Sequence, residues 1–373
     1  MSLVLNEEQL MLRDSAHTFL QSRAPVSHLR ELRDSDNSVG FSRDLWTEMV
    51  EMGWTAILVP EQYGGLGYGC MEMGVVLEES GRTLTPSPLL GTALVGVAAL
   101  VTAGTAEQNA SFLPAVAAGK YLLALACDEA AQHDPECIST TVTKTDSGYQ
   151  ITGCKVAVLD GHVADTFIVS AWTGSDIALF LVPAGFDGVT VEQYPVLDTH
   201  FGANVRLDQV DVGEAHILGD LTNGRQVLER ILDVGRVGAS AEMLGIALEA
   251  FERTMDYLKE RKQFGVPIGS FQALQHRAAS MFGEIEMCKS LVIKALQDLD
   301  EHSSGNAELA SLTKAKLSET CHRVTTEAIQ LHGGIGMTDD FDIGFFLKRS
   351  QILENLYGNA FYHLDRYARL RGY

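Results

Sequence analysis

The chain has 373 residues, of which 46% are hydrophobic and 21% charged, so it is a globular protein large enough for two or three domains. Its net charge of −21 argues against a nucleic-acid partner, which would need a clustered basic surface. No apolar run of 18 residues occurs, and the first residues lack the cationic and apolar segments of a signal peptide. Six cysteines without CxxC spacing suit a reducing compartment. We therefore expect a cytoplasmic protein with no membrane span and no metal site.

Residues 1–118 have the pattern of a helical domain. "NEEQLMLRDSAHTFLQSR", from residue 6, spaces its apolar residues at three and four, and "SRDLWTEMVEMGW", from Ser42, does so after a serine suited to capping a helix. The glycine-rich "VPEQYGGLGYG", from residue 59, predicts a loop. Helical patterns resume with "CMEMGVVLEESGRTL" from Cys70 and with "GTALVGVAALVTAG" from Gly91.

Residues 119–220 predict a β domain. Short segments rich in β-branched residues are separated by Gly and Asp, as in "STTVTKTDSGYQITGCKVAVLDG", "ADTFIVSAW", "DIALFLVPAG" and "VTVEQYPVL". From residue 221 to 373 long helical patterns return, at roughly 223–260, 270–300, 306–332 and 342–370, and they predict a four-helix bundle. In the last one, "LENLYGNAFYHL" at 353–364 contains a Gly-Asn pair that indicates a turn between two helices. The expected fold class is α+β: helical domain, β barrel or sandwich, then bundle.

Two long motifs in the C-terminal region carry a resemblance to a known family. "YLKERKQFGVPIGSFQALQHRAASM" at 257–281 and "AIQLHGGIGM" at 328–337 are similar to the signatures of the acyl-CoA dehydrogenase family, and the domain order resembles that family along the whole chain. The resemblance implies a bound FAD that accepts a hydride from the β carbon of an acyl-CoA thioester while a carboxylate removes the α proton, which gives a 2-enoyl-CoA. Electron-transfer flavoprotein is the electron acceptor that it implies.

The family uses both C-terminal motifs to bind FAD. Its pyrophosphate carries two negative charges, which a guanidinium can meet with paired hydrogen bonds, and glycines let the backbone approach a ligand closely. In the family these residues reach across a subunit interface, toward an FAD that lies mainly on the N-terminal and β domains of a neighbouring subunit. The resemblance therefore assigns cofactor contacts, in trans, to Arg261, Phe264, Gln272, Gln330, Gly333 and Gly334.

The half of the site that would serve this chain's own FAD departs from the family pattern. Where the family has Thr-Glu-Pro followed by Gly-Ser-Asp, "CDEAAQHDPE" at 127–136 keeps only the acidic Glu129. Where it has Trp-Ile-Thr-Asn-Gly, this chain has Ala157-Val158-Leu159-Asp160-Gly161, without the aromatic ring or the hydroxyl. Losses of about 1 to 3 kcal/mol each would together weaken FAD binding in cis by orders of magnitude.

The family's catalytic carboxylate is also missing. An alignment from "HGGIG" without gaps places the usual glutamate position on Tyr357, and the alternative position, just before Arg236, holds Gly235. Holding Tyr357 as phenolate at pH 7 would cost roughly 4 kcal/mol. Glu354 lies one helical turn away from the required position, and Glu229 would need a six-residue shift. We therefore expect no catalytic residue in this chain.

Three hypotheses follow from this pattern. The favoured one is the non-catalytic subunit of a heteromeric acyl-CoA dehydrogenase, since the motifs that serve a neighbour's FAD are intact and those that would serve its own are eroded. This resembles the paired α2β2 acyl-CoA dehydrogenases of bacterial sterol side-chain degradation, in which a paralogous partner carries the glutamate. The alternatives are a homotetrameric flavoenzyme with a non-standard base, and a flavin-free structural paralogue, against which the retained Arg261 and Gln330 argue.

Overall fold

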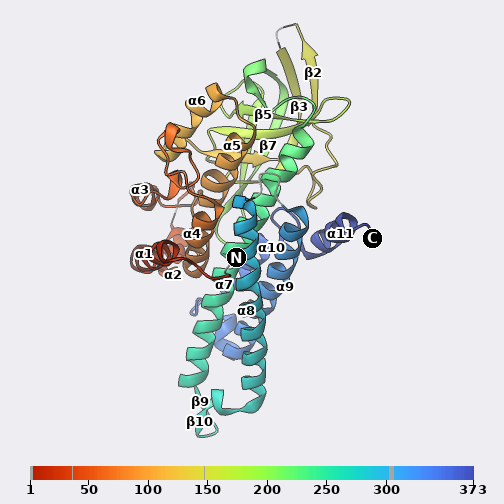
Figure 1. Ribbon diagram of the computed structural model, residues 1–373. Coiled ribbons are helices and arrows are strands. Elements are labelled where there is room, and N and C mark those ends of the chain that lie inside the picture. Colours follow the sequence, from red (N-terminus) through yellow and green to blue (C-terminus); the bar gives the residue numbers. More distant parts are fainter. Residues whose placement is uncertain (1–2, 36, 147, 302–305) are drawn as a thin grey trace. The chain divides into compact units, whose positions relative to one another are not determined.

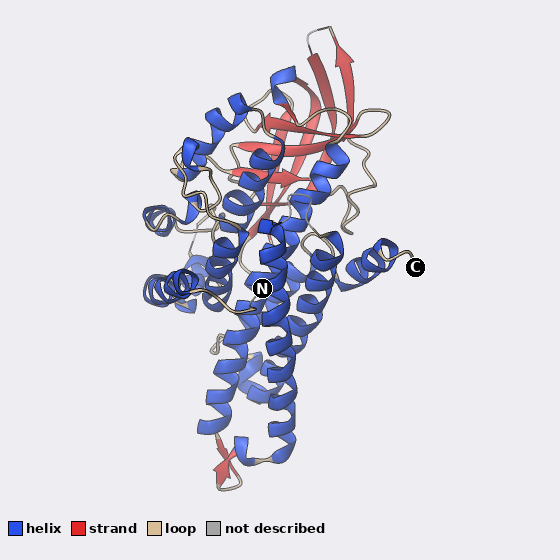
Figure 2. Cartoon of the chain, in the orientation of Figure 1, coloured by secondary structure: helices blue, strands red, loops and turns tan. Residues whose placement is uncertain are grey.

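The computed structural model describes residues 3–35, 37–146, 148–301 and 306–373. The chain forms two compact units. The helical unit comprises Met1–Asp34, Gly74–Thr85 and Arg236–Tyr373, and the sheet unit comprises Ser35–Met73 and Pro86–Gly235. Figure 2 shows helices in blue and strands in red.

The helical unit contains the bundle expected from the C-terminal pattern, together with helices from the N-terminal region (Figure 1). Two helices, α4 and α7, begin in the sheet unit and continue in the helical unit. The bounds are α1 (Glu7–Arg23), α2 (Val26–Asp34), α4 (Cys70–Thr83), α7 (Gly224–Glu260), α8 (Gln272–Glu301), α9 (Ala307–His332), α10 (Ile343–Asn355) and α11 (Ala360–Leu370).

The fourth bundle segment, expected at 342–370, is divided by the turn that the Gly-Asn pair indicated. α10 ends at Asn355, and Asn359 begins α11 as an N-cap whose side chain accepts a hydrogen bond from the Tyr362 N–H at 3.0 Å. The left-handed residues of the turn are Tyr357 and Gly358, with φ of 59° and 106°. Asn359 itself is extended, so its contribution is the cap.

The sheet unit is built around one eight-stranded sheet in the order β6-β7-β3-β2-β4-β5-β8, with β1 parallel to β4. Its buried apolar core includes Phe167, Phe180 and Val205. The helices of the unit are α3 (Arg43–Glu51), α5 (Val97–Ala103) and α6 (Ala106–Ala117), with a π-helical segment at Leu89–Gly96. The strands are β1 (Leu123–Ala126), β2 (Thr141–Thr145), β3 (Gly148–Leu159), β4 (Thr166–Trp172), β5 (Ile177–Pro183), β6 (Val189–Pro195), β7 (Phe201–Val212) and β8 (Ile217–Leu218).

The sequence pattern did not single out β7, although this strand pairs with both β3 and β6. Its buried residues alternate, with Val205 and Leu207 inward, until Gln209, whose φ of 54° shifts the alternation by one before Val210 and Val212. A strand that changes phase in this way loses the regular period-two signal.

Two other local expectations, the cap of α3 and the loop from residue 59, are confirmed. The Ser42 hydroxyl caps α3 by accepting from the Leu45 N–H at 3.2 Å. Residues 59–69 contain no α-helix or strand and turn through Gly64 and Gly67, both with positive φ. Among the described residues no helix is both long and apolar enough to cross a membrane.

Candidate functional site

The first predicted cofactor motif forms a small exposed hairpin at the junction of α7 and α8 (Figure 1). Strands β9 (Lys262–Gln263) and β10 (Val266–Pro267) pair antiparallel. Arg261 immediately precedes the hairpin and is exposed, and Phe264 lies at its tip with φ of 53° and 92% of its surface exposed. An exposed aromatic ring in a left-handed conformation gains little from its own fold.

The second motif lies at the end of α9 and is equally open. Gln330 is exposed on the last turn of the helix, and its carbonyl accepts from the Gly333 N–H. Gly333 has a φ of 66°, and a Cβ built on Gly333 or on Gly334 would meet no atom within 4 Å. Gln272, the first residue of α8, is exposed as well. All six residues therefore present atoms to the outside of this chain.

An aromatic cluster joins the two motifs. The Tyr257 ring, on the last turn of α7, stacks on the His332 ring at a centroid distance of 4.4 Å, and Phe341 lies 4.8 Å from His332 and 6.3 Å from Tyr257. Burial lowers the pKa of His332, although its hydrogen bond with the Ala328 carbonyl opposes that effect. The neutral imidazole of His332 and the phenol ring of Tyr257 can therefore pack face to face as two aromatic rings. The cluster thus fixes the start of the glycine motif next to the end of α7, one turn from Arg261.

The turn at 356–359, where the family carries its base, is enclosed by basic side chains. The Tyr357 carbonyl accepts from Arg236 Nε at 3.2 Å and from His363 Nε2 at 3.0 Å. Lys314 Nζ donates to the carbonyls of Glu354 and Gly358 at 2.9 and 2.8 Å.

These three basic side chains are fully buried. Burial lowers the pKa of Lys314 to about 7, and burial next to Arg236 and Lys314 strongly lowers that of His363. The turn is therefore held through its carbonyls.

The sequence reasoning missed Lys314, but a signal for it exists. It lies on the apolar stripe of α9, between Ala310 and Leu317, followed by Cys321 and Val324 at the same spacing of three and four. A lysine on the buried stripe of a helix requires acceptors inside the fold. The carbonyls of the turn provide them.

None of the four positions compared with the family's glutamate holds a carboxylate within the turn. Tyr357 is only 4% exposed. Glu354 is within the helical unit, where its carboxylate lies 3.3 Å from His322 Nδ1. Gly235 is buried in α7 and carries no side chain, and Glu229 lies on the part of α7 that belongs to the sheet unit.

In the sheet unit, the retained Glu129 is bound by its own domain. Its Oε1 lies 2.6 Å from Nζ of the fully buried Lys155, and its carboxylate accepts from the backbone N–H groups of Ser139 at 2.6 Å and Thr140 at 3.0 Å. Burial alone would raise the pKa of Glu129, but the Lys155 ammonium and these hydrogen bonds lower it to about 2. This carboxylate closes the loop at 127–139 onto β3.

The end of β3 holds the replaced Trp-Ile-Thr-Asn-Gly stretch in an irregular backbone. The register with β7 shifts between Lys155 and Val158, and Ala157 and Asp160 have φ of 52° and 55°. Asp160 is buried, and its Oδ2 lies so near Gly91 that a Cβ there would be 2.6 Å away. No aromatic ring or hydroxyl stands at residues 157–160, so this stretch lacks the groups with which the family contacts flavin.

Comparison with known proteins places the fold and these motifs in one family. The model of the acyl-CoA dehydrogenase N-terminal domain matches residues 6–120, and that of the C-terminal domain matches residues 222–370. A probable acyl-CoA dehydrogenase of Bacillus subtilis, YngJ, is 32% identical over 366 residues, which cover 95% of each chain. The protein belongs to the acyl-CoA dehydrogenase family.

Two solved structures of heteromeric relatives are similar to this chain. A variant of the steroid acyl-CoA dehydrogenase Tcur3481-Tcur3483 is 31% identical with a TM-score of 0.90, and 98% of each chain is covered. The ChsE4-ChsE5 complex of Mycobacterium tuberculosis is 27% identical with a TM-score of 0.92, with both chains fully covered. Enzymes of this family are FAD-dependent oxidoreductases that act on CH–CH groups.

Proposed function

We propose that this chain is the non-catalytic subunit of a heteromeric acyl-CoA dehydrogenase, and that it contributes half of an FAD site to a paralogous partner. The observation that carries the proposal is an asymmetry in preservation. The six residues of the trans motifs are present and face outward, whereas Tyr357, at the usual base position, is buried and carries no carboxylate. Decay without selection would not separate the two groups in this way.

Each exposed group has a chemical task toward a cofactor held by the partner. FAD supplies the hydride acceptor when it is bound to such a complex. Arg261 offers a guanidinium that can bind a pyrophosphate with two parallel hydrogen bonds. Phe264 supplies an aromatic surface, and the open backbone at Gly333 and Gly334 admits a ligand without a Cβ in the way.

The chemistry of the complex follows from the same reasoning. The partner carries the glutamate that removes the α proton, the substrate is an acyl-CoA, and electron-transfer flavoprotein accepts the electrons. Two of the similar structures are described as a steroid acyl-CoA dehydrogenase and as a complex of two named subunits, which supports a polycyclic acyl group and an α2β2 assembly. An assembly with two cofactor sites instead of four leaves room for a bulky substrate.

The test is to purify the chain alone and together with a candidate paralogue that has the glutamate. We expect little flavin and no enoyl-CoA formation from the chain alone, and both from the complex. Arg261→Ala in this chain should weaken FAD binding by the complex about 10- to 150-fold, because a charge-assisted hydrogen bond contributes about 1.5 to 3 kcal/mol. Lys262→Ala is the control, since it removes an exposed cation at the next position.

Two results would contradict the proposal. One is a lone chain that binds stoichiometric flavin and forms enoyl-CoA. The other is a complex in which Arg261→Ala and Lys262→Ala retain FAD equally well, because the arginine would then make no specific contact with the cofactor.

A further inference from the structure

The exposed glycine motif belongs to a segment that is fixed at both ends. We call residues 333–342 the glycine loop. Its beginning is fixed by the stack of His332 on Tyr257, and its far end by ion pairs of Asp339 and Asp342. Between these ends, Ile335 and Met337 are 41% and 79% exposed. The loop thus has an outward-facing middle and anchored ends.

Asp339 is bound by two arginines of α2. Arg33 Nη1 donates to Oδ1 at 2.6 Å and Arg33 Nη2 donates to Oδ2 at 2.9 Å, so the pair is bidentate. Arg30 Nη1 donates to Oδ2 at 3.0 Å. The hydrogen bond from Arg33 lowers the pKa of Asp339, so this carboxylate stays ionised over the physiological range.

Asp342 extends the same arrangement to α7. Its Oδ1 accepts from Arg30 Nη2 at 2.7 Å, and its Oδ2 lies 3.5 Å from Arg253 Nη1. Arg30 therefore bridges both aspartates of the loop, while Arg253 connects Asp342 to the helix that ends one residue before Arg261.

The arginines are themselves held in place. The guanidinium carbons of Arg30 and Arg33 lie 4.8 and 5.2 Å from the centre of the buried Phe345 ring, on α10. Arg253 Nε donates to Glu249 at 2.8 Å. Glu249 is joined in turn to Arg82 of α4.

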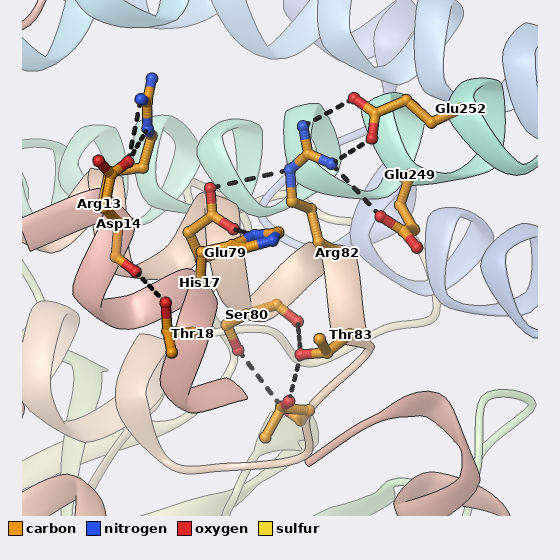
Figure 3. A network of polar contacts seen from close by, with 11 residues as sticks. Arg13, Asp14, His17, Thr18, Glu79, Ser80, Arg82, Thr83, Glu249 and Glu252 are labelled. Carbon is orange, nitrogen blue, oxygen red and sulfur yellow. Dashed lines mark hydrogen bonds and ion pairs between the residues drawn. The ribbon is translucent and has the colours of Figure 1, made fainter. Parts of the chain in front are cut away.

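Arg82 also binds Glu79 and Glu252, as Figure 3 shows. The anchor of the loop is thus continuous with a network that links α4 and α7. The hydrogen-bonding side chains of this network come from several helices, so each of them is held by neighbours on other helices.

We propose that Asp339, with Arg30 and Arg33, is a positioning residue that holds the glycine loop ready for the cofactor of a partner subunit; this inference rests on the proposed function above. Exposed ion pairs contribute little to folding, and Asp339 is 60% exposed at its side chain. A loop that is already fixed, however, loses little conformational entropy when the ligand binds. The ion pairs of Asp339 with Arg30 and Arg33, which we call the clamp, therefore act on cofactor affinity. None of these residues needs to touch the cofactor.

The test uses the complex of this chain with its partner and measures the dissociation constant of FAD by titration, followed by flavin fluorescence. Asp339→Asn keeps the size of the side chain but weakens the clamp. If the free loop of this variant occupies the conformation that binds FAD about a fifth of the time, the apparent dissociation constant of FAD rises about fivefold. Asp340→Asn removes the same charge from an exposed neighbour that has no ion-pair partner among the described residues, and it should bind FAD with wild-type affinity. Asp339→Glu, which can still bind Arg33, should restore most of the affinity.

Subunit stoichiometry and melting temperature are measured for each variant, and a positioning role leaves both unchanged. Wild-type FAD affinity of Asp339→Asn, or an equal loss of affinity in Asp339→Asn and Asp340→Asn, would overturn the inference. Arg261→Ala in parallel separates the two proposals. Normal FAD affinity of Arg261→Ala refutes the trans contribution itself, whereas weakened binding by Arg261→Ala with normal binding by Asp339→Asn refutes the role of Asp339 alone.

Discussion

The buried Lys314 should make the stability of the chain depend on pH in a particular direction. Its pKa is lowered from 10.5 to about 7, chiefly by burial, while the Glu354 carboxylate opposes the shift and Arg236 adds to it. Above pH 7 the folded protein releases this proton, whereas the unfolded chain keeps it up to about pH 10.5. The unfolded state then binds more protons, so the free energy of unfolding rises with pH by about 1.4 kcal/mol per pH unit. Below pH 7 both states are protonated and the dependence ends.

Lys314→Met isolates this effect, because other groups that titrate in the same range do so in both proteins. Between about pH 7.5 and 9.5 the wild type should gain about 2.5 kcal/mol relative to Lys314→Met, measured by urea unfolding at each pH. Lys316→Met is the matched control: this lysine is on the same helix but 29% exposed and paired with Glu284, so its removal should give no such slope. A difference between wild type and Lys314→Met that stays constant with pH, or an equal slope for Lys316→Met, would refute the reasoning.

Three further predictions concern the turn and the sheet unit. Gly358→Ala should lower the free energy of unfolding by about 3 kcal/mol, because the φ of 106° is strained for alanine and its Cβ would lie 2.5 Å from the Tyr362 ring. Gly344→Ala, in open space on α10, should instead raise it by about 0.5 to 1 kcal/mol, and urea unfolding with equal effects at both positions would contradict this account. Lys155→Met should destabilise the chain by about 3 to 5 kcal/mol by leaving Glu129 unpaired, and adding Glu129→Gln should recover part of that; no recovery in the double variant would argue against the pair. Tyr357→Phe should leave turnover of the complex within about twofold of wild type, because the partner's glutamate removes the α proton in the proposed complex and Tyr357 is only 4% exposed. If the wild-type chain alone, replete with flavin, formed enoyl-CoA and Tyr357→Phe abolished that activity, a homomeric enzyme with a tyrosine base would be favoured.

Much of the fold could be predicted from local patterns. The 6–23 periodicity became α1, Ser42 caps α3, and the Gly-Asn pair marks the break between α10 and α11. These features depend on residues within one or two turns of each other, and such information is present in the sequence itself.

Features that depend on distant partners could not be predicted in the same way. Asp339 and Arg33 are separated by 306 positions, and no periodicity connects them. Lys314 could be identified as an unusual residue on an apolar stripe. The carbonyls that it binds could not be identified, because they lie 40 and 44 positions later in the chain. β7 could not be predicted, because Gln209 interrupts its alternation of buried and exposed residues. The six trans residues were placed by motif resemblance, and exposure of the loops that carry them is a property of the folded chain.

The exposure of Phe264 has a consequence for how variation in this protein is interpreted. A side chain with 92% of its surface outside its own fold contributes little to that fold, so its replacement would pass unnoticed in any measurement of the single chain's expression, solubility or melting. If the partner's site depends on this ring, a variant here would behave genetically as a lesion in another gene product. The effects of substitutions in such a subunit therefore have to be measured in the assembled complex. A position that is neutral in the isolated chain can be essential there.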